Sequence, residues 1–448
     1  MNSTRSGRKF KRTLAALGTC LLAMPAMAQE APAEISNGDT AWILMSTAMV
    51  ILMTAPGLAL FYGGLVNQRN VLSTLMHSFF AMCLISVQWV LWGYSFSFGS
   101  GIGGIFGGFD FLLFNGVGQE AHGSVPHLAF AAFQGAFAVI TLALITGAVV
   151  ERFTFKAYIL FALLWTTLIY DPLCYWVWGG GWIGQLGALD FAGGTVVHIS
   201  SGASALVACL VIGRRSAYPS RILPPHSVPL TVIGTSLLWF GWFGFNAGSA
   251  LEAGGLAALA FVVTHTAAAM AGMTWAFMEW IFDGRPTVLG AATGVVAGLV
   301  AITPAAGFVT VPSSIVIGLV AGVLCYYGVY KLKPMLGYDD SLDVVGVHGL
   351  GGTWGAIATG IFATTSVNAA GADGLLYGNP AQLVPQIISI AAAWGLAGIG
   401  TLIILKVVGV IVPLRVKPEE ESVGCDLTLH GETAYNYLAP GMSTSDQG

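Results

Sequence analysis

Charged side chains are scarce in this chain of 448 residues. Asp, Glu, Lys and Arg make up 8% of the sequence, compared with roughly 25% in an average soluble domain. Because 56% of the residues are hydrophobic, too few polar groups remain to cover a soluble surface. The composition and the long apolar runs therefore exclude a soluble domain, a coiled coil and a disordered chain. The net charge of −4 gives no indication of a nucleic-acid partner, and none is expected.

Paired cysteines and clustered metal ligands are also missing from the sequence. The six cysteines are scattered, without the spacing of a disulfide framework or of a cysteine-rich metal site. A metal site needs three or four converging nitrogen, sulfur or oxygen ligands, and the apolar runs contain very few carboxylates. No paired carboxylates or nucleophile triad accompany the histidines, which disfavours an enzyme. We therefore expect neither a metal nor another cofactor.

The first 28 residues have the layout of a bacterial secretory signal peptide. Basic residues precede the apolar run from Leu14 to Met24, and Ala26-Met27-Ala28 supplies a small-residue cleavage site. The alternative is a first membrane span, but the apolar run is shorter than the about 20 residues that a spanning helix needs. We expect cleavage after Ala28.

Apolar runs long enough to cross a membrane follow the signal peptide, and eleven of them can be distinguished. The sequence therefore predicts an all-α membrane protein with a transmembrane domain over 40–412 and a C-terminal tail over 413–448. Sixty glycines fit this prediction, because small residues let membrane helices approach closely. The predicted spans are 40–66, 70–96, 126–150, 157–178, 191–213, 228–248, 254–282, 287–304, 312–332, 342–364 and 382–412.

The twelve Lys and Arg residues beyond the signal peptide indicate the orientation of the chain. All of them fall at or just beyond the exits of odd-numbered spans, and the loops after the even-numbered spans contain none. Positive residues are enriched on the cytoplasmic side of membrane proteins. We therefore expect a multi-pass protein of the bacterial inner membrane, with a periplasmic amino terminus after cleavage and a cytoplasmic carboxyl terminus.

Eleven spans divide into two sets of five and one extra helix. Because five is odd, a second five-span unit enters the membrane from the opposite side, as in the inverted repeats of many transporters. The predicted repeats cover about 40–213 and 228–364, and the eleventh helix covers 382–412. Binding sites in such proteins commonly lie near the midplane, between the repeats.

Two acid-to-histidine patterns occupy equivalent places in these repeats. Asp190 precedes His198 by eight residues at the fifth span, and Asp340 precedes His348 by eight residues at the tenth. Eight helical residues rise about 12 Å, which places the histidines near the midplane. Ionisable residues within a membrane are costly and commonly functional, although hydrogen-bonded packing and metal binding are alternatives. Asp190 is placed to cap the fifth span, to attract a cation or to bind a metal.

Aromatic residues cluster at the predicted outer ends of three spans. They include Phe137, Trp178 and Phe245, with the hydroxyl of Ser249 four residues after Phe245. Such residues commonly form an anchoring belt at the membrane surface. The glycines between them indicate instead a set of rings packed around a narrow opening. Aromatic faces attract cations, and a serine hydroxyl can accept a hydrogen bond from an N–H donor.

Several of these motifs together resemble the ammonium transporter family, which is related to the Rh proteins. They are the segments 190–198, 242–249 and 343–349, the three glycines after Trp178, and the tail segment 426–435. The resemblance covers nearly the entire chain after the signal peptide. It implies a homotrimer with one pore through each subunit. It also implies that a PII-type signalling protein binds the cytoplasmic face.

The resemblance assigns roles to the residues at the outer mouth. It implies that Phe137, Trp178 and Ser249 form an ammonium-recruitment site, supported by Asp190. Phe137 and Phe245 would stack as a gate below this site.

His198 and His348 would be twin histidines in an otherwise apolar pore. An unsolvated ion is strongly disfavoured there, so ammonium should lose a proton before its nitrogen crosses. Imidazoles can accept and pass protons, whereas potassium has no proton to lose. Whether ammonia crosses alone or with a proton stays open.

Two positions depart from the usual family pattern. Ser200 stands where Asn is common, and Cys425 replaces an aliphatic residue in the tail, which bears on regulation more than on transport. An ammonium sensor that signals through the tail with little flux is the alternative function. The short 413–448 segment lacks room for an output domain and favours transport.

Overall fold

The computed structural model describes residues 34–219 and 224–435. The predicted signal peptide and Arg221 lie outside these residues. The chain divides into two units, Met1–Glu34 and Ile35–Gly448, and only Glu34 of the first is described. Everything below concerns the described part of the second unit.

Helices that are long and apolar enough to cross a membrane dominate this unit, and the described residues contain nine of them. A shorter apolar helix, α13, covers Val288–Ile302, and another, α16, covers Leu350–Phe362. Together they are consistent with the eleven predicted spans. The nine long stretches are Asn37–Leu65, Gln68–Phe98, His127–Thr146, Phe155–Gln185, Gly194–Ile212, Val228–Gly248, Gly255–Asp283, Val311–Leu336 and Pro380–Ile411.

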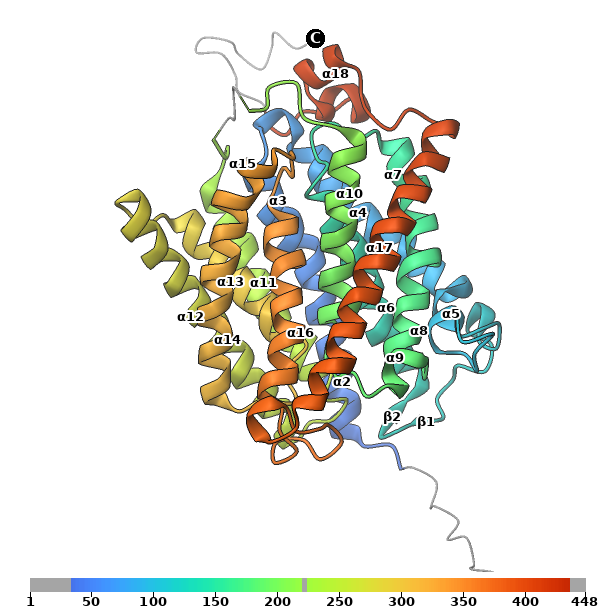
Figure 1. Cartoon of the computed structure of the whole chain (residues 1–448). Coiled ribbons are helices and arrows are strands. Elements are labelled where there is room, and N and C mark those ends of the chain that lie inside the picture. The colour runs from blue at the N-terminus through green and yellow to red at the C-terminus, as the bar shows by residue number, and fades with distance from the viewer. Residues whose placement is uncertain (1–33, 220–223, 436–448) are drawn as a thin grey trace, which may run out of the picture. The chain divides into compact units, whose positions relative to one another are not determined.

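Several spans are interrupted by π-helical turns, so one crossing can carry two labels in Figure 1. The first half of the unit contains α2 (Asn37–Leu52), α3 (Ala59–Leu65), α4 (Val71–Gln88), α5 (Tyr94–Phe98), β1 (Ala121–His122), β2 (Val125–Pro126), α6 (His127–Thr146), α7 (Phe155–Trp165), α8 (Asp171–Val177), α9 (Trp182–Gln185) and α10 (Ser200–Ile212). The second half contains α11 (Val228–Gly248), α12 (Gly255–Asp283), α13, α14 (Val311–Tyr327), α15 (Lys333–Leu336), α16, α17 (Leu383–Ile411) and α18 (Pro418–Val423).

Hydroxyl side chains define where many of these helices begin. The hydroxyls of five residues accept a backbone N–H from the first turn of the helix that follows, which satisfies one of its free donors. Proline is the second residue of α11 and of α14, in the first turn, where its missing N–H costs no helical hydrogen bond. The five N-cap residues are Ser36, Thr154, Ser227, Thr287 and Thr310.

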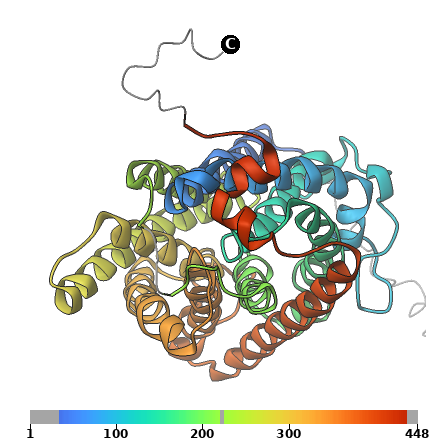
Figure 2. The same cartoon turned by 90° about the horizontal axis from the view of Figure 1, so that it is seen from above.

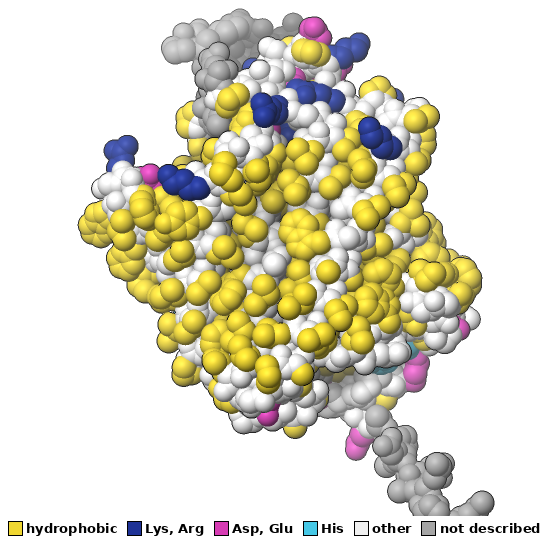
Figure 3. Space-filling model, viewed as in Figure 1, with side chains coloured by type: hydrophobic (Ala, Val, Ile, Leu, Met, Phe, Trp, Pro, Cys, Tyr) yellow, Lys and Arg dark blue, Asp and Glu magenta, His cyan; other side chains and the backbone are white. Residues whose placement is uncertain are grey.

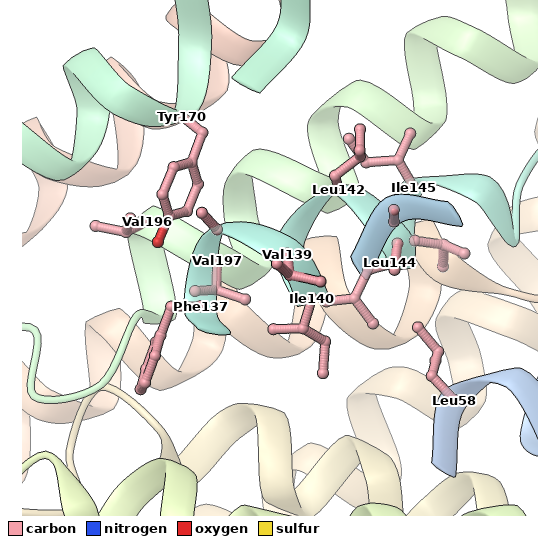
Figure 4. Packing of buried hydrophobic residues seen from close by; sticks show 14 of the residues in the cluster. Leu58, Phe137, Val139, Ile140, Leu142, Leu144, Ile145, Tyr170, Val196 and Val197 are labelled. Atoms are coloured by element: carbon pink, nitrogen blue, oxygen red, sulfur yellow. The ribbon is translucent and has the colours of Figure 1, made fainter. Parts of the chain in front are cut away.

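Among the nine long spans, helix α6 is the most deeply enclosed, and 83% of its most apolar stretch is buried. Its side chains pack against those of neighbouring elements, including Tyr170, Val196 and Val197 (Figure 4). By contrast, α17 runs obliquely along the edge of the bundle (Figures 1 and 2). Only 28% of the most apolar stretch of this span is buried. An apolar helix with so much exposed surface is suited to contact with lipid.

Apolar side chains cover the middle of the face shown in Figure 3, and the Lys and Arg side chains gather toward the end near α18. The chain beyond α17 folds back onto that end of the bundle. Arg415 pairs with Glu421 at 2.7 Å, and Asp426 accepts the backbone N–H of Ser73 at 2.8 Å. The described part of the tail is therefore tied to the helices by specific polar contacts.

Most predicted span boundaries differ from the observed ones by a few residues, and three of these differences have a local explanation. Helix α6 ends at Thr146 rather than at 150, because the chain turns there toward the buried Arg152. The fifth span begins at Gly194 rather than at 191, after Gly193 adopts a left-handed backbone with φ of 113°. The tenth begins after Asp343, which has φ of 63° and breaks the helical path.

Candidate functional site

Two histidines from distant parts of the chain meet inside the bundle. The Nδ1 atoms of His198 and His348 are 3.2 Å apart, and both side chains are buried. Each histidine lies in a π-helical turn, Gly194–Ile199 or Val345–Gly349, that leads into a regular helix. Because two Nδ1 atoms face each other, a hydrogen bond between them requires that one is protonated and the other is not.

Small and aromatic residues allow and stabilise this approach. A Cβ atom on Gly352 would lie 2.9 Å from the Cβ of His198, so glycine is needed for the two segments to pack. Trp242 stacks on the His198 ring with centroids 5.4 Å apart, and its indole N–H donates to the Thr303 hydroxyl at 2.9 Å. The His198 Nε2 atom is buried and has no hydrogen-bond partner among the described residues.

The histidines lie between two small cavities that share Phe61, Val296 and His348 in their walls. The first cavity has a volume of about 10 Å³, which is near the space that one water molecule needs. Apart from the histidines, its walls are apolar: Met53, Leu58, Phe61, Ile140, Leu144, Val197, Leu238, Trp242, Phe245 and Val296. The second cavity, of about 70 Å³, extends to Tyr330 and Asp343. The two cavities adjoin, and we call them together the passage; its more polar end is at Asp343.

Two stacked phenylalanine rings border the passage on its other side, which we call the Trp178 end. The rings of Phe137 and Phe245 lie 4.1 Å apart at an angle of 21°, and both are buried. Trp178 stands perpendicular to Phe137, with centroids 6.1 Å apart. The Ser249 hydroxyl donates to the Phe245 carbonyl at 2.8 Å, which leaves its oxygen free to accept a hydrogen bond.

Asp190 anchors the turn that leads to His198. Its carboxylate accepts backbone N–H groups from Gly193, Gly194 and Thr195 at 2.7–2.8 Å and also accepts the Thr195 hydroxyl. The indole N–H of Trp178 donates to the Asp190 carbonyl at 2.8 Å. Burial raises the pKa of Asp190, and the hydrogen bonds from Thr195, Gly193 and Gly194 act in the opposite direction. The predicted capping role is therefore confirmed in this geometry.

The opposite end of the passage, the Asp343 end, contains ion pairs instead of stacked rings. Lys333 Nζ lies 2.6 Å from Asp343 Oδ1. Arg215 pairs with Asp339 at 2.8 Å and with Glu151 at 2.7 Å. The two Arg215 pairs join loops that follow the third, fifth and ninth spans, so they fix these loops to one another at this end.

The predicted site residues fall into one connected arrangement. Phe137 contacts both Trp178 and Phe245, and Phe245 lies 6.1 Å from the His198 ring. Asp340 lies apart from the paired histidines and accepts the backbone N–H of Val345 at 2.7 Å. The patterns in the sequence thus locate the residues, and the structure brings the histidines, but not the acids, together.

Two supporting residues were missed by the sequence reasoning. Thr195 completes the set of donors around Asp190, and its place in an apolar motif gave little signal. Gln386 of α17 is fully buried and bonds both the N–H and the carbonyl of Leu189. The two glutamines near the start of this span, Gln382 and Gln386, were the signal that could have indicated such contacts. Within residues 34–219 and 224–435, no three His, Cys, Asp or Glu side chains come together as a metal site.

A bundle of membrane-spanning helices that encloses two paired histidines beside small, mostly apolar cavities has the features of a membrane transport protein. The chain matches the Ammonium Transporter Family over residues 41–435 and belongs to it. It is 53% identical to an ammonium transporter of Bacillus subtilis over 401 residues, which cover 89% of this chain and 98% of that one.

Solved structures give the same result for the fold. The chain resembles the crystal structure of Mep2 from Saccharomyces cerevisiae with a TM-score of 0.80 and 37% identity, covering 86% of this chain and 89% of Mep2. It also resembles a protein described as a sensor Amt protein with a TM-score of 0.82 and 30% identity, covering 88% and 98% of the two chains. The predicted family and helical membrane fold are therefore confirmed.

Proposed function

We propose that this protein carries ammonium across the bacterial inner membrane by passing its nitrogen through the pore as ammonia. The observation that carries the proposal is the His198–His348 pair, with Nδ1 atoms 3.2 Å apart beside a cavity of about 10 Å³. Family membership and the named relatives support the substrate.

Recruitment occurs at the Trp178 end, where aromatic faces and the Ser249 oxygen replace part of the water around an ammonium ion. The faces of Trp178 and Phe137 attract the cation. The ion brings four N–H donors, and the Ser249 oxygen can accept one of them. The stacked Phe137 and Phe245 rings close the route below, so the substrate passes only when these rings move.

Deprotonation follows because the passage offers an ion almost nothing in place of water. One N–H bond of ammonium breaks, its electron pair stays on nitrogen, and the proton passes to a base. The buried Nε2 of His198 has no partner among the described residues and is a suitable acceptor. Accepting a proton there lets the shared Nδ1 proton move toward His348, which relays charge along the pair.

The Trp178 end faces the periplasm and the Asp343 end faces the cytoplasm in this proposal. The supporting observation is the distribution of Lys and Arg, which gather toward the α18 end of the face in Figure 3. The resemblance to the family supports a homotrimer and a PII-type signalling protein at the cytoplasmic face. The basic start, the short apolar run and the Ala26-Met27-Ala28 site support a signal peptide over 1–28. The apolar runs support a transmembrane domain over 40–412, followed by a cytoplasmic tail over 413–448.

Uptake of radiolabelled methylammonium in a bacterium without its own ammonium transporters tests the recruitment site. Replacing Trp178 and Ser249 together by Leu removes both an aromatic face and the hydroxyl. We expect initial uptake at low substrate to fall by at least about tenfold, because two contacts with the cation are lost. Asp373→Asn, in an exposed loop, is the control. Uptake by the double variant that equals wild type would overturn the site assignment.

A second candidate function is an ammonium sensor that passes little substrate. It is favoured by the similarity to the sensor Amt protein and by the polar contacts that tie the tail to the bundle. Reconstituted vesicles separate the two functions. Rapid methylammonium flux supports transport, whereas negligible flux together with an intact cellular ammonium response supports sensing.

A further inference from the structure

A buried acid lies within the fourth span and outside the histidine passage. Asp171 is fully buried, at the start of α8, directly after a π-helical turn over Thr166–Tyr170. Its Oδ2 atom accepts the side-chain N–H of Gln88 at 2.8 Å. Gln88 is 1% exposed and ends α4 just before a second π-helical turn, Trp89–Gly93. The acid and the amide therefore join two irregular turns in neighbouring spans.

The Asp171–Gln88 pair contains more buried hydrogen-bond acceptors than its donors can satisfy. Asp171 Oδ1 and Gln88 Oε1 are both buried, and neither has a hydrogen-bond partner among the described residues. None of the ion pairs in the described part of the chain includes Asp171. An ionised carboxylate in an apolar interior is strongly disfavoured without a cation or several donors. A proton on the acid removes the charge and also supplies a missing donor.

The Asp171–Gln88 pair is connected to both walls of the Trp178 end, by which we mean α8, which ends next to Trp178, and α6, which contains Phe137. Asp171 is the first residue of α8, and Trp178 directly follows the last one. The backbone N–H of Trp178 donates to the Cys174 carbonyl of this helix. On the other side, Trp89 follows Gln88 and donates to the Ala131 carbonyl of α6 at 2.9 Å.

Close packing strengthens the second connection. A Cβ atom on Gly135 of α6 would lie 2.7 Å from the Trp89 ring, so α6 rests directly against this indole. Phe137 lies two residues further along α6. The Asp171–Gln88 contact thus sets the distance between the helix that carries Trp178 and the helix that carries Phe137.

We propose that Asp171 is a positioning residue that works as a neutral, protonated acid and, through Gln88, holds the two walls of the recruitment site in register. This inference rests on the proposed function only for its effect on ammonium. The neutral state of the acid is independent of what the protein transports. Asp190, by comparison, is surrounded by backbone donors and performs a different task.

Infrared spectroscopy of the purified protein in lipid tests the neutral state directly. The difference spectrum between wild type and Asp171→Asn should contain the carbonyl stretching band of one protonated carboxylic acid. Asp373→Asn is the matched control, because Asp373 is in an exposed loop and its removal should affect only carboxylate bands. A carboxylate band in the Asp171 difference spectrum would overturn the proposal.

Methylammonium uptake tests the positioning role with the same variants. Asp171→Asn keeps a neutral polar group of the same shape, and we expect its KM within about twofold of wild type. Asp171→Leu removes the short contact of Gln88 and leaves its amide only the long contact with the Thr167 hydroxyl at 3.4 Å. We expect KM to rise about tenfold with kcat nearly unchanged, because displaced walls weaken recruitment. An unchanged KM in Asp171→Leu, or an equal loss in Asp171→Asn, would overturn the positioning role.

Gln88→Leu probes the same contact from the other side and serves if Asp171→Leu fails to reach the membrane. It should also raise KM, and the double variant Gln88→Leu with Asp171→Leu should recover toward wild type, because replacing both partners removes the unpaired groups. A double variant worse than either single one contradicts the pairing. If KM is unaffected even by Trp178→Leu, the recruitment site itself is wrong, while the spectroscopic result for Asp171 stands.

Discussion

The Asp190–His198 and Asp340–His348 segments share a spacing and a π-helical turn, but their acids are held differently. Asp190 accepts three backbone N–H groups at 2.7–2.8 Å and one hydroxyl. Asp340 accepts one N–H at 2.7 Å, and its other oxygen is buried without a partner among the described residues. The two segments have a similar backbone turn and a histidine at the same place, whereas the surroundings of their acids differ.

The divergence matches the two ends of the passage. Asp190 stabilises the turn beside Trp178 and the stacked Phe137 and Phe245 rings. Asp340 lies near Lys333 and Asp343, where ion pairs replace the aromatic cluster. This difference fits the proposal that the cation is recruited at the Trp178 end and released at the Asp343 end.

Replacing each acid by Ala should give the largest difference between the two segments. Asp190→Ala leaves several buried donors unpaired, and we expect a loss of about 4 kcal/mol or more in unfolding free energy together with loss of uptake. Asp340→Ala removes one such bond and should cost about 1 kcal/mol. Thermal unfolding of the purified variants measures both. Equal destabilisation would show that the two acids do the same structural work.

The pH dependence of stability should also distinguish the surroundings of Asp340 from those of Asp190. Burial raises the pKa of Asp340 to about 6, whereas the unfolded chain titrates near the ordinary value of 3.8. The folded state therefore holds the proton more tightly, so this contribution is complete below about pH 4 and is lost as pH rises through about 6. The loss amounts to about 3 kcal/mol at most.

The measurement is the unfolding midpoint between pH 4 and pH 7, compared for wild type and Asp340→Asn. The stability of wild type relative to the variant should fall as pH rises across this interval. Asp373→Asn controls for the other carboxyl groups. A difference that stays constant with pH would show that Asp340 keeps an ordinary titration in the folded protein.

The ion pair at the Asp343 end should have the smallest effect on stability. Lys333→Met removes a partly exposed pair, in which the Asp343 side chain is 29% accessible. Such pairs contribute about 1 kcal/mol or less, and salt screens them. Unfolding in low and high salt should show a small difference that narrows as salt increases. If Lys333→Met lost as much unfolding free energy as Asp190→Ala, the Lys333–Asp343 pair would stabilise the fold as strongly as the Asp190 cap, which contradicts this prediction.

Much of this organisation could be predicted from the sequence, because membrane spans leave a strong signal in composition and charge. The spacing of Asp190 and His198 indicated both a cap and a buried histidine, and the structure contains both. The position of Lys and Arg predicted an orientation, which stays a prediction. The roles of Trp178 and Ser249 in recruitment also stay predictions.

Other features depend on contacts between residues far apart in the sequence. Local patterns could not show that two Nδ1 atoms face each other or that Gln386 holds Leu189. The pairing of Gln88 with Asp171 was missed for the same reason, since each is a single polar residue in an apolar run. Boundaries shifted where one residue, such as Asp343 at φ of 63°, breaks a helix that composition alone would continue.

In the proposed mechanism, one proton-sharing pair formed by His198 and His348 performs the chemistry. Current recording from lipid bilayers tests it most directly by comparing wild type with His198→Ala and His348→Ala after addition of ammonium. We predict that each single variant abolishes ammonium-driven charge movement and that the double variant is no worse, because the two rings act as a unit. Charge movement that persists unchanged in His198→Ala would contradict the account.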